Sequence, residues 1–234
     1  MMVTMYLSFK DCVLYEKDAG ILADRYSWLN DAVIQFWFQL LQDEYSCSLF
    51  LPPCASFMIP FIDEEDILAD TPDNQFRRIF ELAEHGKKLC CVIMPVNNNS
   101  MAESAGGSHW SLLVAHTLVS SSPSTAMPAF LHFDSSDGMN ETVARAMYEK
   151  IVSLFGWKGA AYEKAACPQQ TNGCDCGAYA LIFAETIAAK AERGDLASTF
   201  HADADAKRKE IRTVAADMSK VWRATSDIST TDAQ

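Results

Sequence analysis

The chain has 234 residues, of which 49% are apolar and 21% charged, and its formal net charge is −12. These proportions are ordinary for a globular domain, and they exclude a chain that is mainly disordered. The acidic excess disfavours nucleic acid and anionic membranes as partners. It favours a basic protein surface, although solubility alone also accounts for it.

No stretch of the sequence approaches the roughly 20 apolar residues of a membrane-spanning helix. Residues 1–10 lack the basic start and long apolar core of a secretory signal, so we expect a cytoplasmic or nuclear protein. Eight irregularly spaced cysteines predict reduced thiols rather than disulfides or a zinc site. We expect no metal ion, no cofactor and a monomer.

Hydrophobic periodicity and turn residues predict helices and strands along the chain. In order, these are helices over 32–41 (capped by Asn30 or Asp31) and 73–84, strands over 88–96, 109–119 and 129–134, a helix over 141–155, a strand over 160–167, and helices over 176–191 and 206–222. The strands over 109–119 and 129–134 are expected to form a hairpin. Helices around a cluster of strands indicate the α+β class, as one domain over 1–224 with a flexible tail at 225–234.

Cys176 is the strongest candidate for a reactive residue. It begins an apolar helix at the end of the segment CPQQTNGCDCG, residues 167–177. A helix N-terminus stabilises a thiolate, and Gly177 would let a substrate backbone approach it. Gln170, six residues earlier, can donate to a developing oxyanion, joined by a backbone N–H near Cys176. The alternative is a small buried thiol that happens to begin a helix.

A nucleophilic thiol needs a base, and the base needs an orienting partner. Of the five histidines, His109 opens a predicted strand directly after a pair of glycines, where catalytic side chains are often presented. The strand over 129–134 ends in Asp134, which an antiparallel neighbour can place beside His109. The alternative pairs His132 with Asp134, and it ranks lower because His132 lies inside its strand.

The order His–Asp–Gln–Cys, together with four motifs, resembles the ubiquitin-like-protein-specific cysteine proteases. The motifs are W-L-N-D at 28–31, H-W at 109–110, the strand-ending Asp134, and P-Q-Q-x-N-x-x-D-C-G at 168–177. The resemblance covers about residues 5–222. The double glycine before H-W and the compact N-terminus are more similar to the branch of the family that acts on Nedd8 than to SUMO proteases.

This resemblance implies a papain-like cysteine protease fold of the ubiquitin-like-protease type, with a central mixed sheet flanked by helices. It implies a catalytic triad of Cys176, His109 and Asp134, with Gln170 as the oxyanion residue. One position departs from the family pattern, because Cys174 stands where an aromatic residue is frequent. Cys174 either fills the aromatic's place in packing or captures an oxidised Cys176 as a reversible disulfide.

The resemblance also implies how substrate binds. Trp28 and Trp110 would wall a tunnel that admits only the Gly-Gly tail of a modifier, and Asp31 would contact the tail's backbone. The implied reaction is hydrolysis of the bond after that Gly-Gly, with Nedd8 as the modifier and SUMO or ubiquitin as alternatives.

Two other functions share these sequence features. An acetyltransferase of the same clan would need a basic cofactor-binding surface, which an acidic chain does not favour. A binding module that reads ubiquitin-like modifiers without cleaving them would lack a triad residue, and none is missing here.

Overall fold

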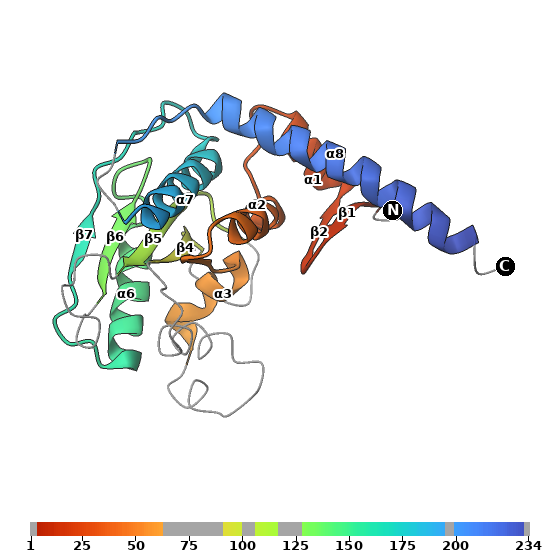
Figure 1. Cartoon of the computed structure of the whole chain (residues 1–234). Helices are drawn as coiled ribbons and strands as arrows, with labels where there is room; N and C mark the ends of the chain where they lie inside the picture. Colours follow the sequence, from red (N-terminus) through yellow and green to blue (C-terminus); the bar gives the residue numbers. More distant parts are fainter. Residues whose placement is uncertain (1–3, 63–90, 100–105, 117–127, 195–198, 232–234) are drawn as a thin grey trace.

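The structure is a computed structural model that describes residues 4–62, 91–99, 106–116, 128–194 and 199–231. Its elements are β1 (Met5–Phe9), β2 (Cys12–Tyr15), α1 (Glu16–Ala23), α2 (Asp31–Glu44), β3 (Ser48–Phe50), α3 (Pro53–Met58), the 3-10 helix η1 (Ile59–Phe61), β4 (Cys91–Asn97), β5 (Trp110–His116), β6 (Ala129–Phe133), α6 (Glu141–Phe155), β7 (Tyr162–Lys164), α7 (Cys176–Glu192) and α8 (Ala204–Thr231). Figure 1 shows a central sheet, a separate ribbon of β1 and β2, and the long helix α8 running from one to the other.

The central sheet is mixed and has the strand order β3-β4-β5-β6-β7. β4 and β6 flank β5 and are antiparallel to it, whereas β3 and β7 run parallel to their neighbours. The antiparallel pairing of β5 with β6 confirms the expected pairing of these two strands, with Leu112 opposite Phe133. The connection between them lies outside the described residues.

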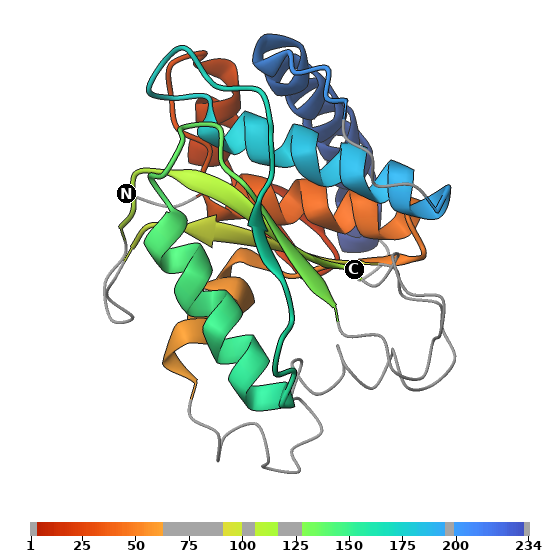
Figure 2. The same ribbon diagram turned by 90° about the vertical axis from the view of Figure 1, so that its left-hand side faces the viewer.

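Helices cover both faces of the sheet (Figure 2). α2 and α7 lie on one face, and α3 and α6 lie on the other. Side chains of β5 alternate between the two cores: Leu112 and Val114 pack toward α7, while Leu113 and Ala115 pack toward α6. A strand buried on both sides therefore appears in the sequence as one continuous apolar run.

Short polar signals set the helix ends. The Asn30 side chain accepts a hydrogen bond from the backbone N–H of Val33 at 3.1 Å, so Asn30 rather than Asp31 caps α2. Gly156 ends α6 in the left-handed conformation, with φ 63°, which a glycine adopts without a steric penalty.

Most of the predicted long elements agree with the structure. The predicted helices over 32–41, 141–155 and 176–191 are α2, α6 and α7, and the predicted strands are β4 to β7 with altered ends. The predicted helix over 73–84 lies outside the described residues. α8 is longer than predicted, so residues 225–231 are helical where the sequence predicts a flexible tail. Within the described ranges, no helix has both the length and the apolarity to cross a membrane.

Candidate active site

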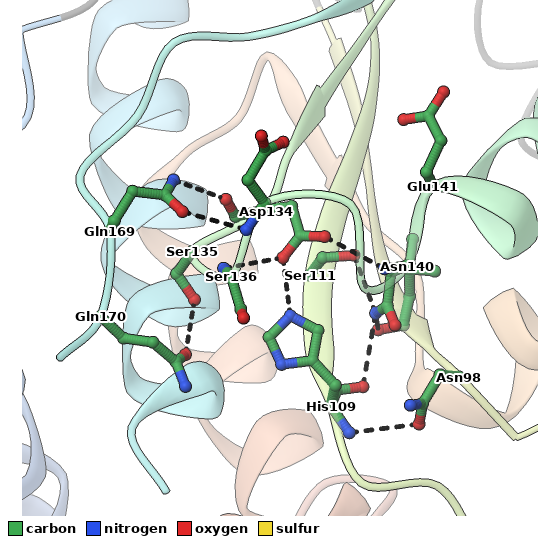
Figure 3. A network of polar contacts seen from close by, with 12 residues as sticks. Asn98, His109, Ser111, Asp134, Ser135, Ser136, Asn140, Glu141, Gln169 and Gln170 are labelled. Atoms are coloured by element: carbon green, nitrogen blue, oxygen red, sulfur yellow. Dashed lines mark hydrogen bonds and ion pairs between the residues drawn. The ribbon is translucent and has the colours of Figure 1, made fainter. Parts of the chain in front are cut away.

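One end of the sheet brings together three chain segments that are far apart in sequence. His109 directly precedes β5 and Asp134 directly follows β6, so the antiparallel pairing places them side by side. His109 Nε2 lies 2.6 Å from Asp134 Oδ1 (Figure 3), and both side chains are buried. Cys176 is the first residue of α7 and is the second hydrogen-bonding partner of His109.

Burial and hydrogen bonds determine the protonation states of His109 and Asp134. Burial lowers the pKa of His109, but the hydrogen bonds with Asp134 and Cys176 outweigh burial and raise the pKa to about 9. Burial raises the pKa of Asp134, and the hydrogen bonds from His109 and from the backbone N–H groups of Asn140 and Ser136 outweigh it and lower the pKa. At neutral pH, His109 is therefore an imidazolium that lies beside the Asp134 carboxylate and Cys176.

His132, the alternative partner for Asp134, belongs to a different cluster. Its Nε2 lies 2.9 Å from Ser111 Oγ, and its Nδ1 lies 3.5 Å from Glu141 Oε2. The carboxylate of Asp134 already accepts hydrogen bonds on both oxygens, from His109, from the N–H of Ser136 and from that of Asn140. The pairing of His132 with Asp134 is therefore wrong.

Asn140 links the ends of the strands, a role that the sequence alone does not predict. Its backbone N–H donates to Asp134 Oδ2 at 3.1 Å. Its buried amide donates to Ser111 Oγ at 2.9 Å and to the carbonyls of Val96 and His109 at 3.0 and 3.3 Å. An asparagine directly before a helix usually signals a cap, but this side chain makes no capping bond to α6. The sequence shows the position of Asn140 but not its partners.

The two glutamines before the nucleophile have different roles in the structure (Figure 3). Gln169 binds the loop after β6, since its Nε2 donates to the Asp134 carbonyl and its Oε1 accepts from the Asp137 N–H. Gln170 binds different groups, with its Oε1 accepting from Ser135 Oγ at 2.8 Å and its Nε2 donating to the Asn172 carbonyl at 2.6 Å. The oxyanion role of Gln170 stays a prediction.

A small cavity of about 150 Å³ brings the predicted substrate residues to the nucleophile. Its lining includes Trp28, Asp31, His109, Trp110 and Cys176. A wider groove of about 600 Å³ shares Asp31 and Trp110 with this cavity and extends along Phe57 and Met58. An extended peptide could therefore lie in the groove with its end at the sulfur.

Both predicted tunnel tryptophans are held by their indole N–H groups. Trp110 is buried and donates to the Leu29 carbonyl at 2.8 Å, and Trp28 is half exposed and donates to the Gly173 carbonyl at 2.7 Å. Their positions depend on the backbones of two other segments, one before α2 and one before α7. The tunnel function itself stays a prediction.

Gly177 has a packing role that the sequence does not reveal. A Cβ atom at Gly177 would lie 2.8 Å from Leu29 Cβ, so the absent side chain lets the segment before α2 pack closely on the first turn of α7. The expectation that Gly177 makes room for a substrate backbone is therefore corrected. The space is filled by Leu29, whose carbonyl also holds Trp110.

The glycine loop before His109 requires glycine at one position. Gly107 has φ +93°, and a Cβ there would lie 1.8 Å from Asn97 Oδ1. The next two backbone N–H groups, of Ser108 and His109, donate to Asn98 Oδ1 at 2.7 and 3.2 Å. The end of β4 thus fixes the approach of the chain to His109.

Cys174 lies two residues before Cys176. The Cys174 sulfur contacts Asn172 Oδ1 at 3.3 Å, and burial, followed by the charge of Asp175, raises the pKa of the thiol. A raised pKa leaves little thiolate to capture an oxidised partner, which favours the packing alternative. Among the described residues, no three His, Cys, Asp or Glu side chains are arranged to hold a metal ion.

Comparisons with known proteins agree with this geometry. A family model described as the Ulp1 protease family, C-terminal catalytic domain, matches residues 27–220. NEDD8-specific protease 1 of Arabidopsis thaliana is 32% identical over 185 residues, which cover 77% of this chain and 74% of that protein. Sentrin-specific protease 8 of Homo sapiens is 31% identical over 185 residues, which cover 77% of this chain and 80% of that protein.

Solved structures show the same fold. The C-terminal Ulp1 protease domain in complex with Smt3, the yeast ortholog of SUMO, superposes with a TM-score of 0.66 at 16% identity, covering 93% of this chain and 89% of that one. Xanthomonas campestris effector protein XopD bound to ubiquitin gives 0.54 at 17% identity, covering 81% and 92%. These likenesses confirm the predicted α+β protease fold. Since the family model spans most of the chain and the curated relatives align with it at about 30% identity, the chain belongs to the Ulp1 family of cysteine proteases.

Proposed function

We propose that this protease cleaves the bond after the C-terminal Gly-Gly of a ubiquitin-like modifier, and that its preferred modifier is Nedd8. The observation that carries the reaction is the 2.6 Å contact of His109 with Asp134 beside the first residue of α7, at the end of a narrow cavity. The choice of modifier rests on the relatives named NEDD8-specific protease 1 and sentrin-specific protease 8.

The geometry supports an acyl-transfer mechanism in two steps. The Cys176 thiolate attacks the carbonyl carbon of the last glycine, and the His109 imidazolium gives its proton to the leaving amine as the C–N bond breaks. Neutral His109 then takes a proton from water, which attacks the thioester and releases the modifier's carboxylate. Asp134 keeps the imidazole ring oriented in both steps and does not itself transfer a proton.

The cavity and groove support a modifier tail as the substrate. A cavity of about 150 Å³ between Trp28 and Trp110 suits residues without side chains. The adjoining groove of about 600 Å³ suits the extended residues that precede them. Phe57 and Met58 supply an apolar wall, and Asp31 supplies a carboxylate where the two spaces join.

A panel of modifiers tests the proposal directly. Nedd8, SUMO and ubiquitin, each with a C-terminal fluorogenic amide, are compared by kcat/KM, and the matching vinyl sulfones are compared by adduct formation. We expect Nedd8 to be preferred by at least about tenfold, a difference of about 1.4 kcal/mol in transition-state binding. Cys176→Ala should form no adduct and yet retain Nedd8 binding, because affinity comes from the docking surface. Preference for SUMO, or an adduct on another cysteine, would overturn the proposal.

The acidic charge of the chain supports the proposal that its partner is a protein. With 31 acidic against 19 basic residues, it favours a protein modifier over nucleic acid or an anionic membrane. We propose that the protein acts as a monomer in the cytoplasm or nucleus, which size-exclusion chromatography with light scattering and imaging of the tagged protein would test. A stable dimer, or exclusion from both compartments, would contradict it.

A further inference from the structure

We propose that Arg208, on α8, is a positioning residue for the nucleophile: its guanidinium neutralises the Asp175 carboxylate directly before Cys176 and fixes the loop that presents the sulfur. The inference rests on Cys176 being the nucleophile. It does not depend on which modifier is cleaved.

Arg208 reaches the nucleophile loop from a distant part of the chain. α8 passes the N-terminal end of α7 (Figure 1). Arg208 Nε donates to Asp175 Oδ1 at 2.9 Å, and Nη2 donates to the Cys174 carbonyl at 2.6 Å. The side chains of Arg208 and Asp175 are only 5% and 8% exposed. Two hydrogen bonds from a planar guanidinium restrict both the side chain and the backbone of the loop.

Asp175 connects Arg208 to the rest of this loop, residues 172–175. Its second carboxylate oxygen accepts from Asn172 Nδ2 at 2.7 Å. Asn172 Oδ1 in turn accepts from the backbone N–H groups of Cys174 and Asp175 at 3.0 and 3.1 Å. Hydrogen bonds within the loop therefore connect Asn172, Cys174 and Asp175 to one another, and Arg208 connects the loop to α8.

Charge gives Arg208 a second effect. A carboxylate directly before Cys176 opposes the negative charge of the thiolate, although the helix N-terminus favours it. The pKa of the neighbouring Cys174 shows the direction in which the charges of Asp175 and Arg208 act. Burial is the main cause of its raised pKa, the charge of Asp175 raises that pKa further, and the charge of Arg208 lowers it. Removing Arg208 would leave a buried carboxylate, directly before the reactive residue in the chain, without its ion-pair partner.

Other charged groups lie around the nucleophile loop on several elements. They are His109, Asp134, Asp31, Asp24, Arg25 and Asp205. Arg25 also interacts with the charge of Asp175, but its side chain is half exposed and forms an ion pair with Asp205. Water and Asp205 therefore weaken its effect, whereas the pair of Arg208 with Asp175 is shielded from solvent.

Lys207, the residue before Arg208, provides a matched control. Its side chain is 10% exposed, and its Nζ lies 2.6 Å from both Glu185 and Glu210 and 4.9 Å from the centre of the Trp37 ring. Lys207 thus also joins α8 to the body of the protein as a buried cation. It contacts the middle of α7 rather than the nucleophile loop.

The test measures the pH dependence of Cys176 alkylation by iodoacetamide, with tandem mass spectrometry to distinguish Cys176 from Cys174. We expect Arg208→Met to move the midpoint of alkylation upward by about 1 pH unit. We expect kcat for a fluorogenic Nedd8 substrate to fall by about tenfold, with KM nearly unchanged. Arg208→Lys keeps the charge, so its alkylation midpoint and its kcat should both lie between those of the wild type and those of Arg208→Met. Lys207→Met should lower the melting temperature without moving the midpoint.

Two further variants test the charge argument separately from folding. Asp175→Asn alone removes the opposing charge and should move the midpoint below that of the wild type. Asp175→Asn combined with Arg208→Met should return the midpoint close to the wild-type value. An unchanged midpoint in Asp175→Asn, or equal shifts in Arg208→Met and Lys207→Met, would overturn the proposal. Alkylation needs no modifier. The test of Arg208 can therefore be interpreted even if the protease does not prefer Nedd8.

Discussion

His109 directly precedes β5, and His132 lies in the neighbouring strand β6. Both are buried, at 2% exposure, yet the pKa values of the two imidazoles are shifted in opposite directions. Each imidazole lies near a carboxylate. His109 contacts Asp134 at 2.6 Å, and the pKa of His109 is raised to about 9. His132 lies 3.5 Å from Glu141, and burial, only partly offset by nearby carboxylates, lowers the pKa of His132.

The carboxylates explain the difference. Asp134 is buried, and two backbone N–H groups fix its orientation toward His109. Glu141 is more exposed and also interacts with Arg145 and Lys164. A buried histidine therefore holds a proton when the backbone of the fold orients a carboxylate onto it, and proximity alone is not enough.

The largest expected effect comes from exchanging each histidine for the same residue. His109→Gln removes the acid and base of the reaction and should lower kcat/KM by on the order of a thousandfold. His132→Gln keeps a polar group beside Ser111 and should lower it by less than about tenfold. Kinetics with a fluorogenic modifier and melting curves of both variants check this. Equal losses of activity would mean that the two sites do not differ as described.

The next largest difference in kcat/KM is expected between variants of the two carboxylates, Asp134 and Glu141. Asp134→Asn should lower kcat/KM by about a hundredfold, less than His109→Gln, because Asp134 orients the ring and transfers no proton. Asp134 and Cys176 together raise the pKa of His109 to about 9, so loss of Asp134 should lower that pKa and move the alkaline fall in kcat/KM to lower pH. Glu141→Gln should leave that fall in place. A full pH–rate profile of each variant provides the measurement, and an unmoved alkaline limb in Asp134→Asn would contradict the assignment.

Two tryptophans extend the comparison to the walls of the cavity. Trp110→Ala should lower kcat/KM by about ten- to a hundredfold, because a misplacement of about 1 Å at the scissile bond is sufficient for such a loss. Trp157→Ala removes an indole that packs with the core beside α6, away from the cavity. It should affect melting more than turnover. Circular dichroism serves as the control: if Trp110→Ala is inactive only because it is unfolded, the role in the cavity loses its support.

The smallest effect is expected at Cys174. Its thiol contacts Asn172, and its raised pKa makes it a poor partner for an oxidised Cys176. Wild type and Cys174→Ser should therefore regain equal activity when a mild reductant follows peroxide treatment. Better recovery of the wild type would instead support a protective disulfide.

The sequence was sufficient to predict long elements with a periodic or continuous apolar pattern, and sites that lie within one short motif. α2, α6 and α7 have enough turns for their apolar spacing to be read, and the apolar run before Asn97 indicates a buried strand. The motif at 168–177 places Cys176 at a helix start within one stretch of chain. Pairing His109 with Asp134 required only one antiparallel strand pair.

Short elements could not be predicted in the same way. β1, β2, β3 and α3 have only three to six residues each, too few to show a period. α8 continues past Trp222, although residues 223–231 are mostly Thr, Ser and Asp, which have low helix propensity. The apolar spacing that predicts this helix ends at Trp222, so the sequence pattern does not reveal its last turns.

The tertiary structure alone decided which polar groups meet. Asn140 and Arg208 lie 36 and 32 residues from Cys176, and hydrogen bonds bring one to the base and the other to the nucleophile loop. Gly177 is required by Leu29, from a segment nearly 150 residues earlier. The sequence was sufficient to predict the reactive residues because their chemistry is local to each side chain. Their charges and positions depend on distant partners, which only the folded chain brings within hydrogen-bonding distance.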